Sequence, residues 1–304
     1  MKLLLVDGSA LLHRAYHAYP PLTAKNGQVV GAVYGVASML YSALVEVSPS
    51  HVMVAWDLPK PTFRHEKYVG YKAQRPKADI EMVEQIPYVK SVIKAMGIVQ
   101  LEVEGYEADD IIGTLSRLPE PEEIIILTGD QDTMQLVNTR VSILTPPKGK
   151  LPAKMYGVEE VKEKYGVWPT QIVDYKALIG DVSDNIPGVA GVGPKTAANL
   201  LKTFETLERI YRDITQVQLH FGEIVAKRLV DGKESAFLSQ DLSRIVTEMP
   251  LAVSVEEMAY RDIKQEELRN LLDELGFKSL VSRIWGESEK KQKTKIPDNQ
   301  MGLF

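Results

Sequence analysis

The sequence predicts an α/β protein in which a mostly parallel sheet flanked by helices is followed by an α-helical region. Four short apolar runs, separated by segments with helical spacing, are typical of buried parallel strands and cover residues 3–6, 52–55, 124–127 and 141–144. Past Trp168 this signal fades, and apolar residues recur at helical spacing over 172–179, 196–204, 224–229 and 266–275. We therefore expect an α/β domain over residues 1–168 and a helical region over 169–286.

Composition narrows the class of protein and the type of site. The 304 residues suffice for one large or two modest domains, and the absence of cysteine excludes disulfides and thiolate metal sites. The net charge of −5 does not favour a nucleic-acid partner, so any such contact must come from local patches. The first apolar run is interrupted by Asp7, which makes it too short for a signal or membrane segment. We expect a cytoplasmic, monomeric protein with no membrane contact.

Aspartates follow three of the four predicted strands. Asp7 follows the first, Asp57 the second, and Asp130 and Asp132 the third. In open parallel sheets, ligands bind outside the carboxyl ends of the strands. Side chains two apart in an extended segment point the same way, so Asp130 and Asp132 are expected to act together.

Two further groups of acids extend this set. Glu107, Asp109 and Asp110 open an amphipathic helix, where carboxylates suit the helix dipole, and Asp181 and Asp184 lie in IGDVSDNIPG. Each acid alone is also consistent with a cap or turn role, but their convergence would be strongly repulsive without divalent cations. The spacing does not fit a calcium loop, and hard oxygen ligands suit Mg²⁺ or Mn²⁺. The pattern predicts two ions that hydrolyse a phosphodiester.

A glycine-rich stretch, IPGVAGVGPKTAANLL, precedes one of the predicted helices. Gly191 and Gly193 lie just before a helix that carries Lys195 and Thr196, which makes a seat for anions. A P-loop is disfavoured because Pro194 precedes the lysine and no strong strand precedes the motif. A hairpin between two helices that grips duplex phosphates is favoured over an ordinary turn.

Basic residues alternate with aromatic ones in TFRHEKYVGYKAQRPKADIE, between Asp57 and the acidic helix. This combination suits a groove for single-stranded nucleic acid, since it offers charge for the backbone and ring faces for bases, although charge runs are often only solvated faces. Within this stretch Arg64 and Tyr71 are expected to contact DNA, and Lys72 and Arg75 are expected to act in catalysis. Arg14, earlier in the chain, is a further expected DNA contact.

The motifs LLLVDGSALLHRAY, AWDLPKPTFRHEKYVGYKAQR, GYEADDIIGTL, ILTGDQDTMQLV and GDVSDNIPGVAGVGPKTAANLL occur in this order. Together they resemble the 5′-nuclease (5′-3′ exonuclease) domain of bacterial DNA polymerase I, in the flap endonuclease superfamily, over about residues 1–285. The resemblance implies a PIN-like sheet with a helical arch at about 64–96, then a helix–hairpin–helix region that grips duplex DNA, with a K⁺ ion at the hairpin. It also implies cleavage of branched, nicked or flapped duplex DNA and removal of RNA primer strands.

The resemblance assigns roles residue by residue. The implied metal-site acids are Asp7, Asp57, Glu107, Asp109, Asp110, Asp130, Asp132, Asp181 and Asp184. Lys72 and Arg75, with Tyr71, match arch residues that steer the scissile phosphate, and the hairpin matches at Gly191, Gly193, Lys195 and Thr196. Gln131 departs from the family, which usually has lysine there, and this removes a positive charge beside the metals. Two alternatives remain: a non-catalytic DNA-binding module has no need of these acids, and a PIN-type ribonuclease has no need of the hairpin.

The last segment, residues 287–304, is polar and lysine-rich and is expected to be a flexible tail. It ends in QMGLF, which resembles the peptide by which bacterial replication proteins dock on the sliding clamp. Leu303 and Phe304 would anchor in an apolar pocket, and Gln300 would bond at its rim. The alternative is a truncated linker.

Overall fold

The computed structural model describes residues 1–147, 149, 151–261, 263 and 266–293. Within these residues the sheet has six strands in the order β3-β2-β1-β4-β5-β6, and only β6 is antiparallel to its neighbour. The strands are β1 (Lys2–Asp7), β2 (His51–Ala55), β3 (Val99–Leu101), β4 (Glu123–Leu127), β5 (Val141–Thr145) and β6 (Lys154–Tyr156). The predicted mostly parallel α/β sheet is confirmed.

The middle of the sheet fixes where the acids emerge. Strand β1 pairs with both β2 and β4, with Asp7 opposite Ala55 and Val6 opposite Leu127. Because all three strands run in parallel, their carboxyl ends lie at one edge of the sheet. The four apolar runs coincide with β1, β2, β4 and β5. The sequence missed β3 and β6, which have three residues each and lack a fully buried side chain.

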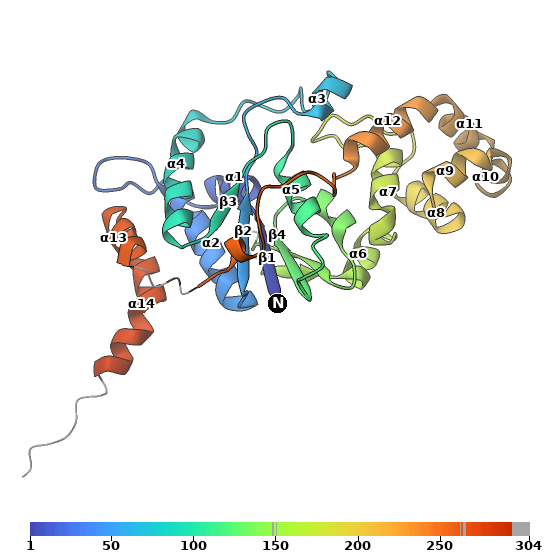
Figure 1. Cartoon of the computed structure of the whole chain (residues 1–304). Coiled ribbons are helices and arrows are strands. Elements are labelled where there is room, and N and C mark those ends of the chain that lie inside the picture. Colours follow the sequence, from blue (N-terminus) through green and yellow to red (C-terminus); the bar gives the residue numbers. More distant parts are fainter. Residues whose placement is uncertain (148, 150, 262, 264–265, 294–304) are drawn as a thin grey trace, which may run out of the picture.

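Helices cover both faces of the sheet (Figure 1). The helices of the first half are α1 (Gly8–Ala18), α2 (Gly31–Val47), α3 (Phe63–Lys67), α4 (Ile80–Ala95), α5 (Ala108–Leu115) and α6 (Val158–Tyr165), with the 3₁₀ turn η1 (Asp132–Leu136). Alternate side chains of β1 enter two cores: Leu4 and Val6 pack with α1, α2 and α4, whereas Leu3 and Leu5 pack with α5 and the helical region.

The helical region follows at one end of the molecule (Figure 1). It contains η2 (Pro169–Gln171), α7 (Ile172–Ile179), α8 (Pro194–Phe204), α9 (Leu207–Arg212), α10 (Ile214–Phe221), α11 (Glu223–Asp231) and α12 (Lys233–Ser243). Helix α7 packs against α8 and α12 and also contacts η1, the turn that follows β4.

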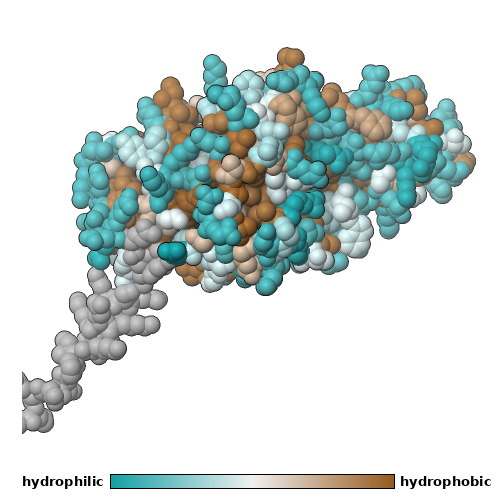
Figure 2. All heavy atoms as spheres, in the orientation of Figure 1, coloured by the Kyte–Doolittle hydropathy of each residue, from teal (hydrophilic) through white to brown (hydrophobic). Residues whose placement is uncertain are grey.

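After α12 the chain returns across the sheet through η3 (Glu256–Met258) to α13 (Glu266–Glu274) and α14 (Lys278–Lys293). Figure 2, drawn in the orientation of Figure 1, shows hydrophilic side chains over most of the visible surface. Apolar side chains gather near its middle, where the returning segment runs in Figure 1. Leu268, Leu272 and Leu280 are buried with α4 in the first core. The last two helices therefore pack on the α/β domain, although the sequence grouped them with residues 169–286.

Helix α14 continues to Lys293, so the predicted start of the tail at residue 287 falls inside a helix.

Among the described residues, no helix combines the length and apolarity needed to cross a bilayer.

Candidate active site

Asp7 and Asp57 accept hydrogen bonds that connect segments at the carboxyl ends of the three central strands. Asp7 caps α1 by accepting a hydrogen bond from the backbone N–H of Ala10 at 2.8 Å, and also accepts one from the Thr128 hydroxyl at 2.8 Å. Asp57 accepts a hydrogen bond from the N–H of Ala108 at 2.9 Å, at the start of α5. The ends of β1, β2 and β4 and the beginning of the acidic helix thus share one edge.

Burial and mutual repulsion mark five of the acids as one cluster. Burial, with the nearby charges of Asp57 and Asp130, raises the pKa of Asp7 to about 7. Burial, with repulsion from Asp130 and Asp7, raises the pKa of Asp109 well above its usual range. Burial also raises the pKa of Asp132 to about 7, despite an ion pair with Lys176. These carboxylates lie within electrostatic reach of one another, and a divalent cation would relieve their repulsion.

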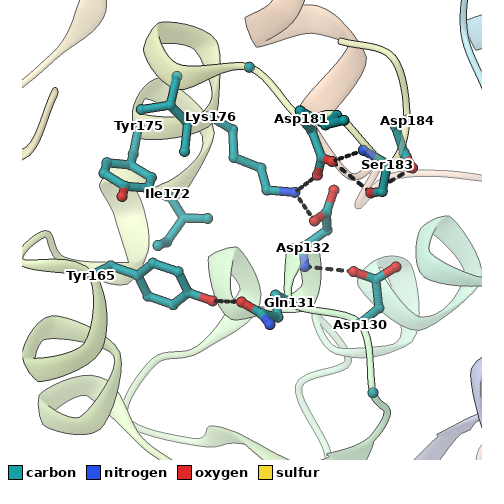
Figure 3. Close-up of a pocket in the computed structure, with 14 residues that line it drawn as sticks. Asp130, Gln131, Asp132, Tyr165, Ile172, Tyr175, Lys176, Asp181, Ser183 and Asp184 are labelled. Carbon is teal, nitrogen blue, oxygen red and sulfur yellow. Dashed lines mark hydrogen bonds and ion pairs between the residues drawn. The ribbon is translucent and has the colours of Figure 1, made fainter. Parts of the chain in front are cut away.

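Asp181 and Asp184 join this cluster from the loop after α7 (Figure 3). Although burial opposes it, the ion pair with Lys176 and hydrogen bonds from Ser183 lower the pKa of Asp181 to about 2. Asp184 is buried, and its charge contributes to the raised pKa of Asp132. The loop therefore adds two carboxylates on the side of the helical region.

The predicted arch residues Tyr71, Lys72 and Arg75 form hydrogen bonds and ion pairs with these acids. The Lys72 ammonium is 2.7 Å from Glu107 Oε1, and Arg75 forms an ion pair with Asp184. The Tyr71 hydroxyl hydrogen-bonds to Glu107 at 3.0 Å and to Asp184 at 3.3 Å. The two cations predicted to steer DNA are thus paired with predicted metal ligands, and Tyr71, only 3% exposed, is covered.

Two sequence predictions disagree with the structure, and both involve one buried ion pair. Arg64 is 2% exposed and donates two hydrogen bonds of 2.8 Å to Asp110, with further bonds to the carbonyls of Leu242 and Arg244. Asp110 is fully buried and also accepts from the N–H of Val246. Arg64 is buried and so has almost no surface for the predicted DNA contact, and the Asp110 carboxylate is engaged by Arg64 instead of being free to hold a metal ion. The pattern of basic and aromatic residues cannot separate a groove cation from one that is buried under the arch.

The predicted hairpin presents exposed backbone before α8. Gly191 has φ +79°, a left-handed conformation that glycine adopts without strain, and its carbonyl accepts from Arg228 at 2.9 Å. Gly193 and Lys195 are exposed and Thr196 is half-buried at the beginning of the helix. Exposure leaves these groups accessible, and their contact with phosphate stays a prediction.

Arg14 is half-exposed on α1, and its guanidinium donates to the carbonyl of Pro147 at 3.3 Å. It lines a hollow of about 810 Å³ with His13 and His17, and Asp130 lies at the edge of this hollow. Arg14 therefore adjoins the acid cluster from the side of the first helix.

The sequence missed Lys176, which is the most closely engaged cation in the hollow shown in Figure 3. This hollow, of about 520 Å³, runs from Asp130 past Lys176 to Tyr165 and Tyr175. The sequence signal that could have identified Lys176 was a single lysine in the apolar helical segment IVDYKALI, just before GDVSD.

The donor set fits a hard divalent cation, since it consists of carboxylates from five separate segments. In the part of the chain that the structure describes, however, no three acidic or histidine side chains are arranged to hold an ion as they stand. Lys72, Arg75 and Lys176 are paired with these carboxylates instead. Metal binding would therefore require some of these ion pairs to open.

Acids at the carboxyl edge of a parallel sheet, a cationic arch and a glycine-turned hairpin together define the class of metal-dependent 5′-nucleases. The chain belongs to the 5′-3′ exonuclease family: residues 2–166 match its N-terminal resolvase-like domain and 167–266 match its C-terminal SAM fold. The resemblance predicted from the motifs is confirmed.

Relatives and solved structures agree with this assignment. The chain is 40% identical over 300 residues to DNA polymerase I of Bacillus subtilis (strain 168), covering 98% of this chain and 34% of that protein. It is 41% identical over 308 residues to DNA polymerase I of Caldicellulosiruptor bescii, covering 98% of this chain and 36% of that protein. The chain thus spans about a third of the length of these relatives.

Two solved structures share the fold. A zinc-bound T5 5′-exonuclease has a TM-score of 0.66 at 21% identity, covering 95% of this chain and 99% of that one. The catalytic core of Rad2 in complex with a DNA substrate has a TM-score of 0.62 at 16% identity, covering 93% of this chain and 92% of that one. At these identities the likeness confirms the fold alone.

Proposed function

We propose that this chain is a structure-specific 5′-nuclease that cuts branched, nicked or flapped duplex DNA and removes RNA primer strands. The observation that carries the proposal is the cluster of Asp7, Asp109, Asp130 and Asp132, in which burial and the charges of neighbouring carboxylates raise the pKa values of Asp7, Asp109 and Asp132. A non-catalytic DNA-binding module would not need this cluster of buried carboxylates, which repel one another.

The acids would hold two Mg²⁺ or Mn²⁺ ions, which when bound supply an activated water molecule and charge stabilisation for the leaving oxygen. Asp7, Asp109, Asp130 and Asp132 form the centre of the set, with Asp57, Glu107, Asp181 and Asp184 around it. Thr128 and the N–H of Ala10 orient the Asp7 carboxylate.

The arch residues would receive the cut strand. Lys72 and Arg75 now neutralise Glu107 and Asp184, and we infer that they turn to the scissile phosphate once those carboxylates bind metal. Their charge would then stabilise the phosphate as it reacts. Arg14, on the other side of Asp130, is a further candidate contact for the backbone of the strand.

The hairpin would grip the uncut duplex without reading its sequence. Gly191, Gly193, Lys195 and Thr196 present backbone groups and one cation, which suit phosphate oxygens rather than base edges. A K⁺ ion bound at the hairpin would add to this grip.

The test is cleavage of a labelled 5′-flap duplex by Asp7→Asn and Asp130→Asn variants. We expect flap affinity to remain near that of the wild type while cleavage in Mg²⁺ falls by about two orders of magnitude or more, because phosphate contacts persist without the metal site. Asp213→Asn, an exposed acid far along the chain, is the matched control. Near-normal cleavage by both variants would remove the metal assignment, and cleavage of single-stranded RNA alone would favour a PIN-type ribonuclease.

The predicted clamp peptide, Gln300 to Phe304, lies outside the described residues. On its sequence alone we propose that Gln300, Leu303 and Phe304 dock on a sliding clamp, and that the chain acts as a cytoplasmic monomer. Deletion of the five residues should leave cleavage of free flaps unchanged and abolish binding to the clamp of the same organism. Equal binding by the intact and shortened chains would reject the peptide.

A further inference from the structure

Lys176 joins two of the candidate metal ligands. Its side chain extends from α7, is 12% exposed, and forms ion pairs with Asp132 from η1 and with Asp181 from the following loop, the latter at 2.7 Å (Figure 3). These two carboxylates are the counter-charges of the ammonium. None of the motifs that define the family assignment singled out this lysine.

The position of the ammonium conflicts with a metal ion. Lys176 Nζ lies between the Asp132 and Asp181 carboxylates, where a divalent cation held by both acids would also lie. The two cations would compete for these carboxylates, because they repel each other and each oxygen engaged by the lysine has lost part of its capacity to bind metal.

The surroundings allow the side chain to leave. Loss of one partner from a buried ion pair is strongly unfavourable unless another charge replaces it, so the exchange has to be coupled to the arrival of the metal. The hollow of about 520 Å³ beside Lys176 gives its four-carbon stem room to swing toward Tyr165 and Tyr175. The face of an aromatic ring can attract a displaced cation.

We propose that Lys176 is a positioning residue that serves as an internal counter-ion of the metal site. It holds Asp132 and Asp181 together before metal binding, and the divalent ion displaces it from at least one of them. The proposal rests on the proposed function, since it takes both acids to be metal ligands. It adds that the metal affinity of the free protein is set in part by competition with this lysine.

The experiment is a calorimetric titration of Mn²⁺ into the full chain without DNA, for wild type and Lys176→Met. The methionine keeps the length of the side chain but removes its charge. We expect Lys176→Met to bind Mn²⁺ roughly tenfold more tightly, because no buried ion pair has to open. In chelator the variant should unfold at a lower temperature than wild type, and Mn²⁺ should raise its unfolding temperature by a larger amount.

Lys164→Met is the matched control, because Lys164 lies over the ring of Tyr165, which lines the same hollow, and forms no ion pair with an acid among the residues that the structure describes. It removes one positive charge nearby, and its effect on Mn²⁺ affinity should stay below about twofold at 0.15 M salt, where distant charges are screened. Equal effects of the two variants would reduce the role of Lys176 to general electrostatics and overturn the proposal. So would Mn²⁺ affinity in Lys176→Met that equals or falls below that of wild type.

A second measurement uses the unaltered protein, in case the variant does not fold. The ¹⁵N resonance of the Lys176 ammonium should shift when Mg²⁺ is added, and an unchanged resonance at saturating Mg²⁺ contradicts displacement. If the wild type binds no divalent ion at all, the metal site of the proposed function fails. If it binds the ion but Lys176→Met binds no more tightly, only the counter-ion role fails.

Discussion

The ammonium of Lys72 lies 2.7 Å from the carboxylate of Glu107, so an arch residue is paired with the N-cap residue of helix α5. The backbone supports this contact: Lys72 has φ +54°, and its N–H donates to the carbonyl of Asp184 at 2.9 Å. A non-glycine residue in the left-handed region is strained unless its surroundings hold it there. The arch and the acid loop are therefore locked together before any substrate arrives.

Removal of the arch cations should slow cleavage more than it weakens binding. Lys72→Ala and Arg75→Ala lose charge that we place at the scissile phosphate, so single-turnover cleavage should fall by about one hundredfold. Flap affinity measured in chelator should change by less than about tenfold, because the hairpin contacts remain. Lys67→Ala, an arch lysine paired with Asp241 instead, is the control and should cleave normally. Equal losses in rate and affinity would show that the two cations only bind.

Removal of the hairpin lysine should weaken DNA binding more than it slows cleavage. Lys195→Ala should weaken binding to flap DNA and lower the slope of log affinity against log salt by about 0.9, the change expected for one lost phosphate contact. The cleavage rate at saturating DNA should stay near that of wild type. Lys202→Ala, in the last turn of the same helix α8, provides the comparison. An unchanged affinity and slope for Lys195→Ala would leave the hairpin as a structural turn.

The buried pair of Arg64 and Asp110 should govern stability rather than DNA contact. Arg64→Met leaves the Asp110 carboxylate buried without its partner, and the free energy of unfolding in urea should fall by about 3–5 kcal/mol. Arg212→Met, which breaks an exposed pair with Asp213, should cost less than about 1 kcal/mol. A stable Arg64→Met variant that fails to bind flap DNA would restore the surface role predicted from the sequence.

The sequence predicted the sheet and the position of the acids because both depend on local pattern. A run such as LLLV buries on both sides only as a central strand, and the next residue, Asp7, then has to lie at the carboxyl edge. The same pattern fails for β6, where Lys154 and Met155 are exposed and only three residues pair. Edge strands of this length carry too few buried side chains to be recognised.

Partners distant in the chain could not be predicted in the same way. Arg64 contacts Leu242 and Arg244 across the fold, and nothing near Arg64 in the sequence distinguishes it from the exposed Lys67. Leu268 and Leu272 lie on a clear apolar stripe, yet the stripe does not say which surface it covers. Lys176 is missed for the same reason, since its two acids come from different segments.

The stability of the metal-free protein should depend on pH through the acid cluster. The pKa values of Asp7 and Asp132 are raised from 3.8 to about 7 in the folded state by burial. Between these two pH values the folded state keeps protons that the unfolded state has released. The contribution of these two acids to the free energy of unfolding is therefore complete below about pH 4 and is lost as pH rises through 7. Asp181, with its pKa lowered to about 2, acts in the opposite direction, but only below about pH 4.

In chelator, the free energy of unfolding of the wild type should therefore fall between pH 5.5 and pH 8.5, two conditions chosen on either side of the raised pKa values, and Mg²⁺ should restore it at the higher pH. The double variant Asp7→Asn, Asp132→Asn should show a flatter dependence in chelator and little response to Mg²⁺. Burial lowers the pKa of His13, which opposes this trend in both proteins, so the decisive quantity is the difference between wild type and variant in urea unfolding. Parallel pH profiles for the two proteins would contradict the raised pKa values and, with them, the repulsion on which the metal site is argued.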